Sequence, residues 1–163
     1  MNRIVSRTVP IEVGLALDCF PPCLRQLLEF DVFNGDPVFA GIKRYPNEKA
    51  SDGRSYRDTA HVCYPYHTYD GRTTVVLPQP IGVSHTVHEL AHVLDYALDF
   101  SVDAQPVTRY AQTNRREAFA EFVTALLVPG YLHYDPRGER YVASQRRQIV
   151  QLGMQEEERC VAH

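Results

Sequence analysis

Residues 84–98 read SHTVHELAHVLDYAL, a pattern typical of one amphipathic helix. Ser84 is a residue type that caps helix N-termini, and the apolar residues after it recur at helical spacing. Residues that share the apolar face or widen it are Val87, Leu90, Ala91, Leu94, Ala97 and Leu98. We therefore expect a central helix from residue 84 to about residue 98, packed against the rest of the chain.

Two histidines on this helix, His88 and His92, lie four residues apart. Residues at that spacing point the same way, so both imidazoles can reach one metal ion. Glu89 is offset around the helix, where it is placed to accept a proton from a water molecule that the ion activates. Zinc lowers the pKa of bound water to roughly 7, which makes this possible at neutral pH. The alternative, two histidines without a ligand role, would bury unpaired polar groups at a cost.

Downstream, the sequence predicts a second helix over residues 114–127. Either Thr113 or Asn114 can cap it, and Pro129 with Gly130 ends it. Its apolar residues keep helical spacing: Phe119, Phe122, Val123 and Leu126.

A catalytic zinc site needs a third protein ligand and an open fourth position. Glu117 and Glu121 lie four residues apart on the second helix and share a face. One can bind zinc while the other orients a ligating histidine through a hydrogen bond. No Gly-x-x-His follows His92, so a glutamate-type site is preferred over a site with three histidines.

Residues 110–121 read YAQTNRREAFAE. With the His-Glu-x-x-His helix, this segment resembles the peptidase domain of anthrax lethal factor and the related Pro-Pro endopeptidases. That family places a tyrosine seven residues before the glutamate ligand, as Tyr110 stands before Glu117. It also tends to carry an aspartate three residues after the second histidine, where this chain has Asp95. The resemblance extends from residue 87 to about residue 122.

The resemblance implies a zincin-like domain with a single zinc ion, whose ligands are His88, His92 and Glu117. Glu89 would be the catalytic base, and Tyr110 would stabilise the oxyanion by donating a hydrogen bond where charge develops. Asp95 and Glu121 would support the ligands from behind. The connection between the two helices is shorter than in that family, so the family's substrate preference, including a preference for proline, is not transferred.

Two other functions remain open at this point. Regulatory peptidases found beside phage-type repressors also pair a His-Glu-x-x-His helix with a second helix that ends in Leu-Leu-x-Pro, echoed here by residues 126–129. The spacing back to the glutamate differs by one residue. The second alternative is a zinc-stabilised binding module without catalysis, against which Glu89 argues because a structural site has no use for a base.

The segment before the central helix predicts a small antiparallel sheet. Candidate strands cover residues 38–45, 60–66 and 73–77, with the turn residues Asp70 and Gly71 between the last two. A substrate peptide is expected to pair with residues 73–77 as an edge strand. A helix is expected after Pro21 and Pro22.

A last helix is expected over residues 139–158. The order of elements favours an α+β domain with helices packed on a small sheet. The chain has 163 residues, which fits one domain over residues 1–163.

Composition narrows the partners. A net charge of −3 does not favour a nucleic acid as the partner, and no apolar run approaches the ~20 residues that span a membrane. The partner that the resemblance implies is a peptide or protein substrate. The start lacks the apolar middle of a secretory signal, which gives a cytoplasmic location by default and leaves signal-independent delivery open. Four cysteines are expected to be free thiols rather than disulfides: Cys19, Cys23, Cys63 and Cys160.

Overall fold

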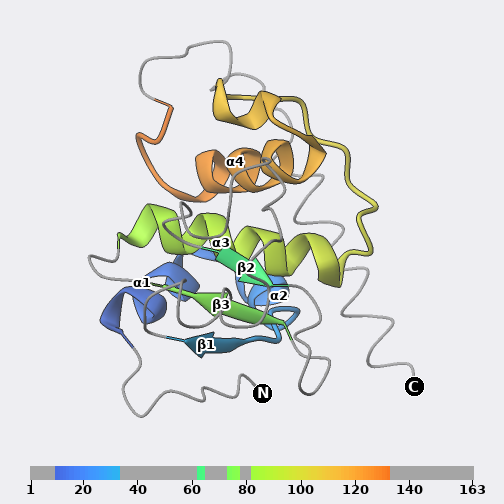
Figure 1. The fold of residues 1–163 in the computed structure, drawn as a ribbon. Coiled ribbons are helices and arrows are strands. Elements are labelled where there is room, and N and C mark those ends of the chain that lie inside the picture. Colours follow the sequence, from blue (N-terminus) through green and yellow to red (C-terminus); the bar gives the residue numbers. More distant parts are fainter. Residues whose placement is uncertain (1–9, 34–61, 65–72, 78–81, 133–163) are drawn as a thin grey trace, which may run out of the picture.

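The computed structural model describes residues 10–33, 62–64, 73–77 and 82–132, which form helices around a small sheet (Figure 1). The elements in chain order are α1 (Ile11–Cys19), α2 (Pro22–Arg25), β1 (Asp31–Phe33), β2 (Val62–Tyr64), β3 (Thr74–Val76), α3 (Val83–Ala97), the 3-10 turn η3 (Tyr110–Gln112) and α4 (Arg115–Leu127). This arrangement confirms the α+β class.

The first helices are divided by proline. Helix α1 ends at Cys19 because Phe20, the residue before Pro21, is extended with φ −81° and ψ 133°. Helix α2 then lasts a single turn. The helix predicted after the prolines is therefore short, and α1 was not predicted at all. Cys19 and Cys23 are free thiols, as expected.

The sheet has the strand order β1-β3-β2. Strands β2 and β3 pair antiparallel, which confirms the predicted pairing on either side of Asp70 and Gly71. Strand β1 was not predicted and pairs parallel with β3, so the sheet is mixed. The prediction of an edge strand at residues 73–77 is wrong: Val75 is paired with Val32 on one side and with Cys63 on the other.

Helix α3 confirms the predicted central helix, with small differences at its ends. It begins at Val83, with Gly82 rather than Ser84 in the capping position and no side-chain cap. A Cβ atom on Gly82 would lie 2.9 Å from Nδ1 of His85, so glycine leaves room for that ring. Ala97, predicted to widen the apolar face, is exposed in the last turn.

Helix α4 confirms the second predicted helix and packs along α3. Of the two candidate caps, Asn114 is the one that caps it. In Figure 1 the sheet lies on the side of α3 away from α4. The central helix is thus covered on one side by α1 and β2 and on the other by α4.

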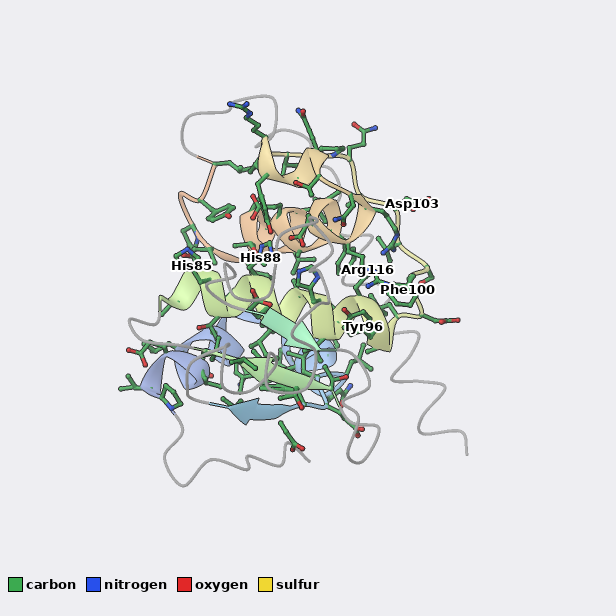
Figure 2. The ribbon with its side chains drawn as sticks, in the orientation of Figure 1. His85, His88, Tyr96, Phe100, Asp103 and Arg116 are labelled. Carbon is green, nitrogen blue, oxygen red and sulfur yellow. The ribbon has the colours of Figure 1, made fainter. Side chains whose placement is uncertain are left out.

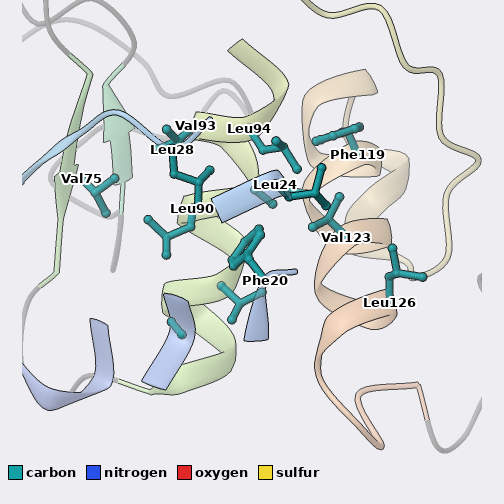
Figure 3. Close-up of a cluster of buried hydrophobic side chains, with 14 of the residues drawn as sticks. Phe20, Leu24, Leu28, Val75, Leu90, Val93, Leu94, Phe119, Val123 and Leu126 are labelled. Carbon is teal, nitrogen blue, oxygen red and sulfur yellow. The ribbon is translucent and has the colours of Figure 1, made fainter. Parts of the chain in front are cut away.

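The hydrophobic core contains side chains of α3 and of the elements that pack on either side of it. Its largest fully buried side chains in the described residues are Val13, Phe20, Leu24, Leu28, Val32, Val75, Leu77, Leu90, Leu94, Phe119 and Phe122. Figure 3 shows Phe20 and Leu24 from the α1–α2 region together with Leu90 and Leu94 of α3 and Phe119 of α4. Because all these elements share one cluster, the position of α4 on α3 is set by common packing.

Several predictions fall outside the described residues: the strand at residues 38–45, the helix at residues 139–158, and the thiol of Cys160. Within the described residues, none of the helices combines the length and the apolar character needed to cross a membrane.

Candidate metal centre

Helix α3 brings the two histidines to the side that faces α4. Their ring centroids lie 5.0 Å apart with an interplanar angle of 85°. The side chains are 12% exposed for His88 and 10% for His92. One turn of helix therefore presents two nearly buried imidazoles at a common point, as their spacing predicted.

Helix α4 supplies a carboxylate to the same point. Oε2 of Glu117 lies 3.0 Å from Nε2 of His88 and 3.6 Å from Nε2 of His92. The backbone of Glu117 is fixed in turn, because its N–H donates to Oδ1 of Asn114 at 3.0 Å. One donor atom from each of His88, His92 and Glu117 lies within 4.8 Å of the others, a group that could hold a metal ion.

Glu121 approaches His88 from the opposite side of the ring. Its Oε1 lies 3.0 Å from Nδ1 of His88. The hydroxyl of Tyr131 donates to the same oxygen at 2.7 Å, and the hydroxyl of Thr108 donates to Oε2 at 2.6 Å. In the neutral tautomer with Nδ1–H donating to Glu121, the lone pair of Nε2 would be available to a cation held between His88 and Glu117. Of the two candidate glutamates, Glu117 joins the donor group and Glu121 orients a histidine.

Glu89 is buried at 7% exposure beside this group. Burial raises the pKa of its carboxyl, while the positive charges of His88 and His92 lower it in part. Glu89 is not among the residues that form the donor group in the described part of the chain. It is therefore a neighbouring carboxylate with an elevated proton affinity, as a general base requires.

Tyr110 belongs to η3, the turn that leads into α4. Its ring centroid lies 6.0 Å from that of His88, and the residue is 39% exposed. The turn is held by Thr113, which returns two hydrogen bonds to the carbonyl of Tyr110 at 2.7 Å and 3.0 Å. The phenol is thus placed beside the candidate centre and open to solvent.

The buried carboxylates at the centre favour a bound cation. Burial lowers the pKa of His88, but its hydrogen bonds to Glu117 and Glu121 and the nearby negative charges raise it to about 10. Burial acts to raise the pKa of Glu117, but its contacts with both histidines hold that pKa well below its usual range. Since Glu89, Glu117 and Glu121 are all buried, their charges need compensation, which a divalent cation between the imidazoles would provide. The residues present therefore fit a metal ion.

Asp95, the other predicted support of the ligands, pairs with an arginine of α4. Its Oδ2 accepts a hydrogen bond from Nη1 of Arg115 at 2.6 Å, and Oδ1 has no hydrogen-bond partner among the described residues. The link that the structure shows thus runs from α3 to the start of α4, rather than directly to a histidine.

Three residues around the centre were not singled out from the sequence: Thr108, Arg115 and Tyr131. Thr108 and Tyr131 lie in loops, where spacing gives no signal of a shared partner. Arg115 carries a weak signal, because a positive charge in the first turn of a helix opposes the helix dipole, but this signal does not identify its partner.

Comparison with known proteins adds no relative: the chain matches no protein-family model and no curated protein.

Proposed function

We propose that this chain is a zinc-dependent peptidase with a zincin-like fold, similar to the peptidase domain of anthrax lethal factor and the Pro-Pro endopeptidases. The observation that supports it is the convergence of His88 and His92 from α3 with Glu117 from α4. Two imidazoles and one carboxylate are a donor set that suits zinc, and three protein ligands are typical of catalytic rather than structural zinc sites.

The chain's own residues then have separate tasks. Bound zinc would supply an activated water molecule and polarise the scissile carbonyl. Glu89 accepts the proton of the attacking water and passes it to the leaving amine, and burial tunes its pKa toward that task. Tyr110 donates a hydrogen bond to the carbonyl oxygen as negative charge develops there. Glu121 keeps His88 in the tautomer whose Nε2 can bind the ion.

The substrate is proposed to be a peptide or protein segment in extended conformation. Strand β3 is paired on both sides, so it has no free edge for a substrate. We therefore expect the main chain of the substrate to pair with an outer strand of the described sheet. Strand β2 is the better candidate, since it contacts α3, which carries the metal ligands. No nucleic acid or membrane enters this proposal.

The proposal is tested with E89Q and the parent protein side by side. We expect the parent to cleave members of a peptide library and to lose this activity with a chelator. E89Q should keep its zinc content and lower turnover about 100- to 10,000-fold, because the base is removed while the ligands stay. Zinc content is measured by elemental analysis and cleavage by mass spectrometry.

The outcomes separate the functions that the ligand set allows. A parent that binds zinc but cleaves no peptide indicates a zinc-stabilised binding module. A parent that cleaves only a folded regulator protein indicates the repressor-associated type of peptidase. A parent that neither contains nor binds zinc contradicts the proposal as a whole.

A further inference from the structure

Helices α3 and α4 are joined by three polar connections in sequence. Arg115 contacts Asp95, Glu117 contacts both histidines, and Glu121 contacts His88. Moving along α4 from its first residue, the partners on α3 run backwards, so the helices are antiparallel. The first connection lies outside the metal centre and has no role in the chemistry described above.

We propose that Arg115 is a positioning residue for the metal centre, which fixes the start of α4 on the C-terminal end of α3 and so holds Glu117 against the histidines. This inference rests on the metal-binding part of the proposed function. It does not require that the bound metal catalyses peptide hydrolysis.

The guanidinium of Arg115 uses its planar fork on two elements at once. Nη1 donates to Oδ2 of Asp95 at 2.6 Å. Nη2 donates to the carbonyl oxygen of Phe100 at 2.8 Å and to that of Val102 at 2.6 Å. Asp95 is fully buried, so this ion pair is shielded from water on its acidic side. Such bidentate use of arginine fixes direction as well as distance, which a lysine ammonium cannot do.

The corner after α3, residues 99–102, accepts two hydrogen bonds from Arg115 and has a strained backbone. Asp99 and Phe100 follow α3 with backbone φ angles of 50° and 54°, values that residues other than glycine rarely adopt. The N–H of Asp99 donates to the carbonyl of Tyr96 and that of Phe100 to the carbonyl of Asp95, which is the Schellman pattern of a helix end. Two adjacent residues in this conformation persist only where their surroundings hold them.

Aromatic rings around Arg115 also hold its guanidinium in place. Its guanidinium carbon lies 5.6 Å from the ring centroid of Phe100 and 5.9 Å from that of Phe119. The ring of Tyr96 meets that of Phe100 edge to face at 5.4 Å. Figure 2 shows Tyr96 and Phe100 at the opposite end of α3 from His85, with Arg116 close by. Arg115 therefore contacts α3, the corner and α4 itself.

The connection to the metal centre is short. Arg115 begins α4, and Glu117 is the third residue of the same first turn. A helical turn is stiff, so a shift of its first residue along α3 also moves Glu117. The distances of 3.0 Å and 3.6 Å from Oε2 of Glu117 to the two histidine Nε2 atoms leave little room for such a shift. Removing the grip should therefore weaken the binding of a metal ion.

The test measures zinc affinity by chelator competition in the full chain, with R116M as the matched control. Arg116 is the next residue, loses the same charge and also stacks on Phe100, at 5.5 Å, but does not share the three hydrogen bonds of Arg115. We expect R115M to lower zinc affinity about 10- to 100-fold, as loss of an orienting group does. R115K should recover part of this loss, and R116M should stay within about twofold of the parent.

A general loss of stability is separated from positioning with D99G. Glycine relieves the strain at φ 50°, so D99G should raise the melting temperature of R115M. If Arg115 positions Glu117, zinc affinity stays low in the D99G/R115M double variant. If affinity returns with stability, or if R115M binds zinc like the parent, the inference is overturned. Should R115M not fold, R115K takes its place, and an unfolded R115K also overturns the inference. A parent without zinc affinity instead contradicts the proposed function.

Discussion

Helix α3 has two buried faces that are buried for different reasons. Toward α1 and the sheet it presents apolar side chains such as Leu90 and Leu94, both with 0% exposure. Toward α4 it presents His92 at 8% and Asp95 at 0%. Burial of a leucine stabilises a fold by roughly 1.5–3 kcal/mol, whereas burial of a polar group without a partner costs roughly 2–7 kcal/mol. Burial of the apolar face therefore stabilises the fold, whereas burial of the ionisable face destabilises it unless its polar groups have partners.

In the described part of the chain, side chains of α4 provide polar partners for this second face. His88 has Glu117 and Glu121, and Asp95 has Arg115. If these positions served only to pack α3 against α4, leucine would fill them as it does on the first face. A helix that keeps an ionisable face buried indicates a task that needs those groups. We expect substitutions on the two faces to have separable effects on stability and on metal binding.

The largest effect is expected for H92A, which removes a proposed zinc ligand from the ionisable face. Zinc affinity should fall on the order of 1,000-fold or more, because the ~10–16 kcal/mol of a structural zinc site is shared among only a few ligands. Chelator competition measures the affinity. The rise in melting temperature on adding zinc should also disappear. A variant that still binds zinc like the parent would remove His92 from the centre.

The next effect is expected for L90A on the apolar face. Leu90 is fully buried, so its truncation should lower the free energy of unfolding of the metal-free chain by about 2–5 kcal/mol. Urea denaturation measures this loss. Zinc affinity of the folded protein should change by less than about threefold, since Leu90 is absent from the donor group. A large loss of affinity in L90A would show that the two faces are not separable.

The pH dependence should also separate the faces. In the metal-free fold His88 faces Glu89, Glu117 and Glu121, and its pKa is raised from 6.5 to about 10. Its charge therefore stabilises the fold fully below pH 6.5, and this contribution is lost as the pH rises toward 10. Zinc needs the neutral imidazole, so its affinity should rise about tenfold per pH unit between pH 7 and 9. Competition titrations at several pH values check this, and a flat profile contradicts it.

The sequence predicted the two helices of the centre because their signals are local. In α4, Asn114 caps the helix by accepting a hydrogen bond from the N–H of Glu117 on its side-chain oxygen, and Pro129 with Gly130 ends the helix. In α3, the apolar spacing and the His-Glu-x-x-His pattern coincide. Such short-range signals act within one or two turns, so they can be read without the tertiary structure.

The parts that the sequence did not predict depend on distant contacts. Strand β1 is three residues long and acquires its place only by pairing with β3, about forty positions later in the chain. That same pairing turns β3 from an edge strand into the central one. Arg115 became interpretable only when Asp95 and the carbonyls of the corner at Phe100 were seen beside it. In each case the deciding partner lies on another element.

The smallest effect is expected for T108V, which tests whether the ionisable face extends into the loop. The hydroxyl of Thr108 donates to Glu121 at 2.6 Å and accepts from the N–H of Ala111 at 3.0 Å, so one oxygen links the support of His88 to the turn that carries Tyr110. Valine keeps the shape and removes both bonds, which should lower peptide turnover about tenfold. Serine keeps the hydroxyl, so T108S should remain within about twofold of the parent. Turnover at the parent's level in both T108V and T108S would show that the hydrogen bonds of the Thr108 hydroxyl do not support the centre.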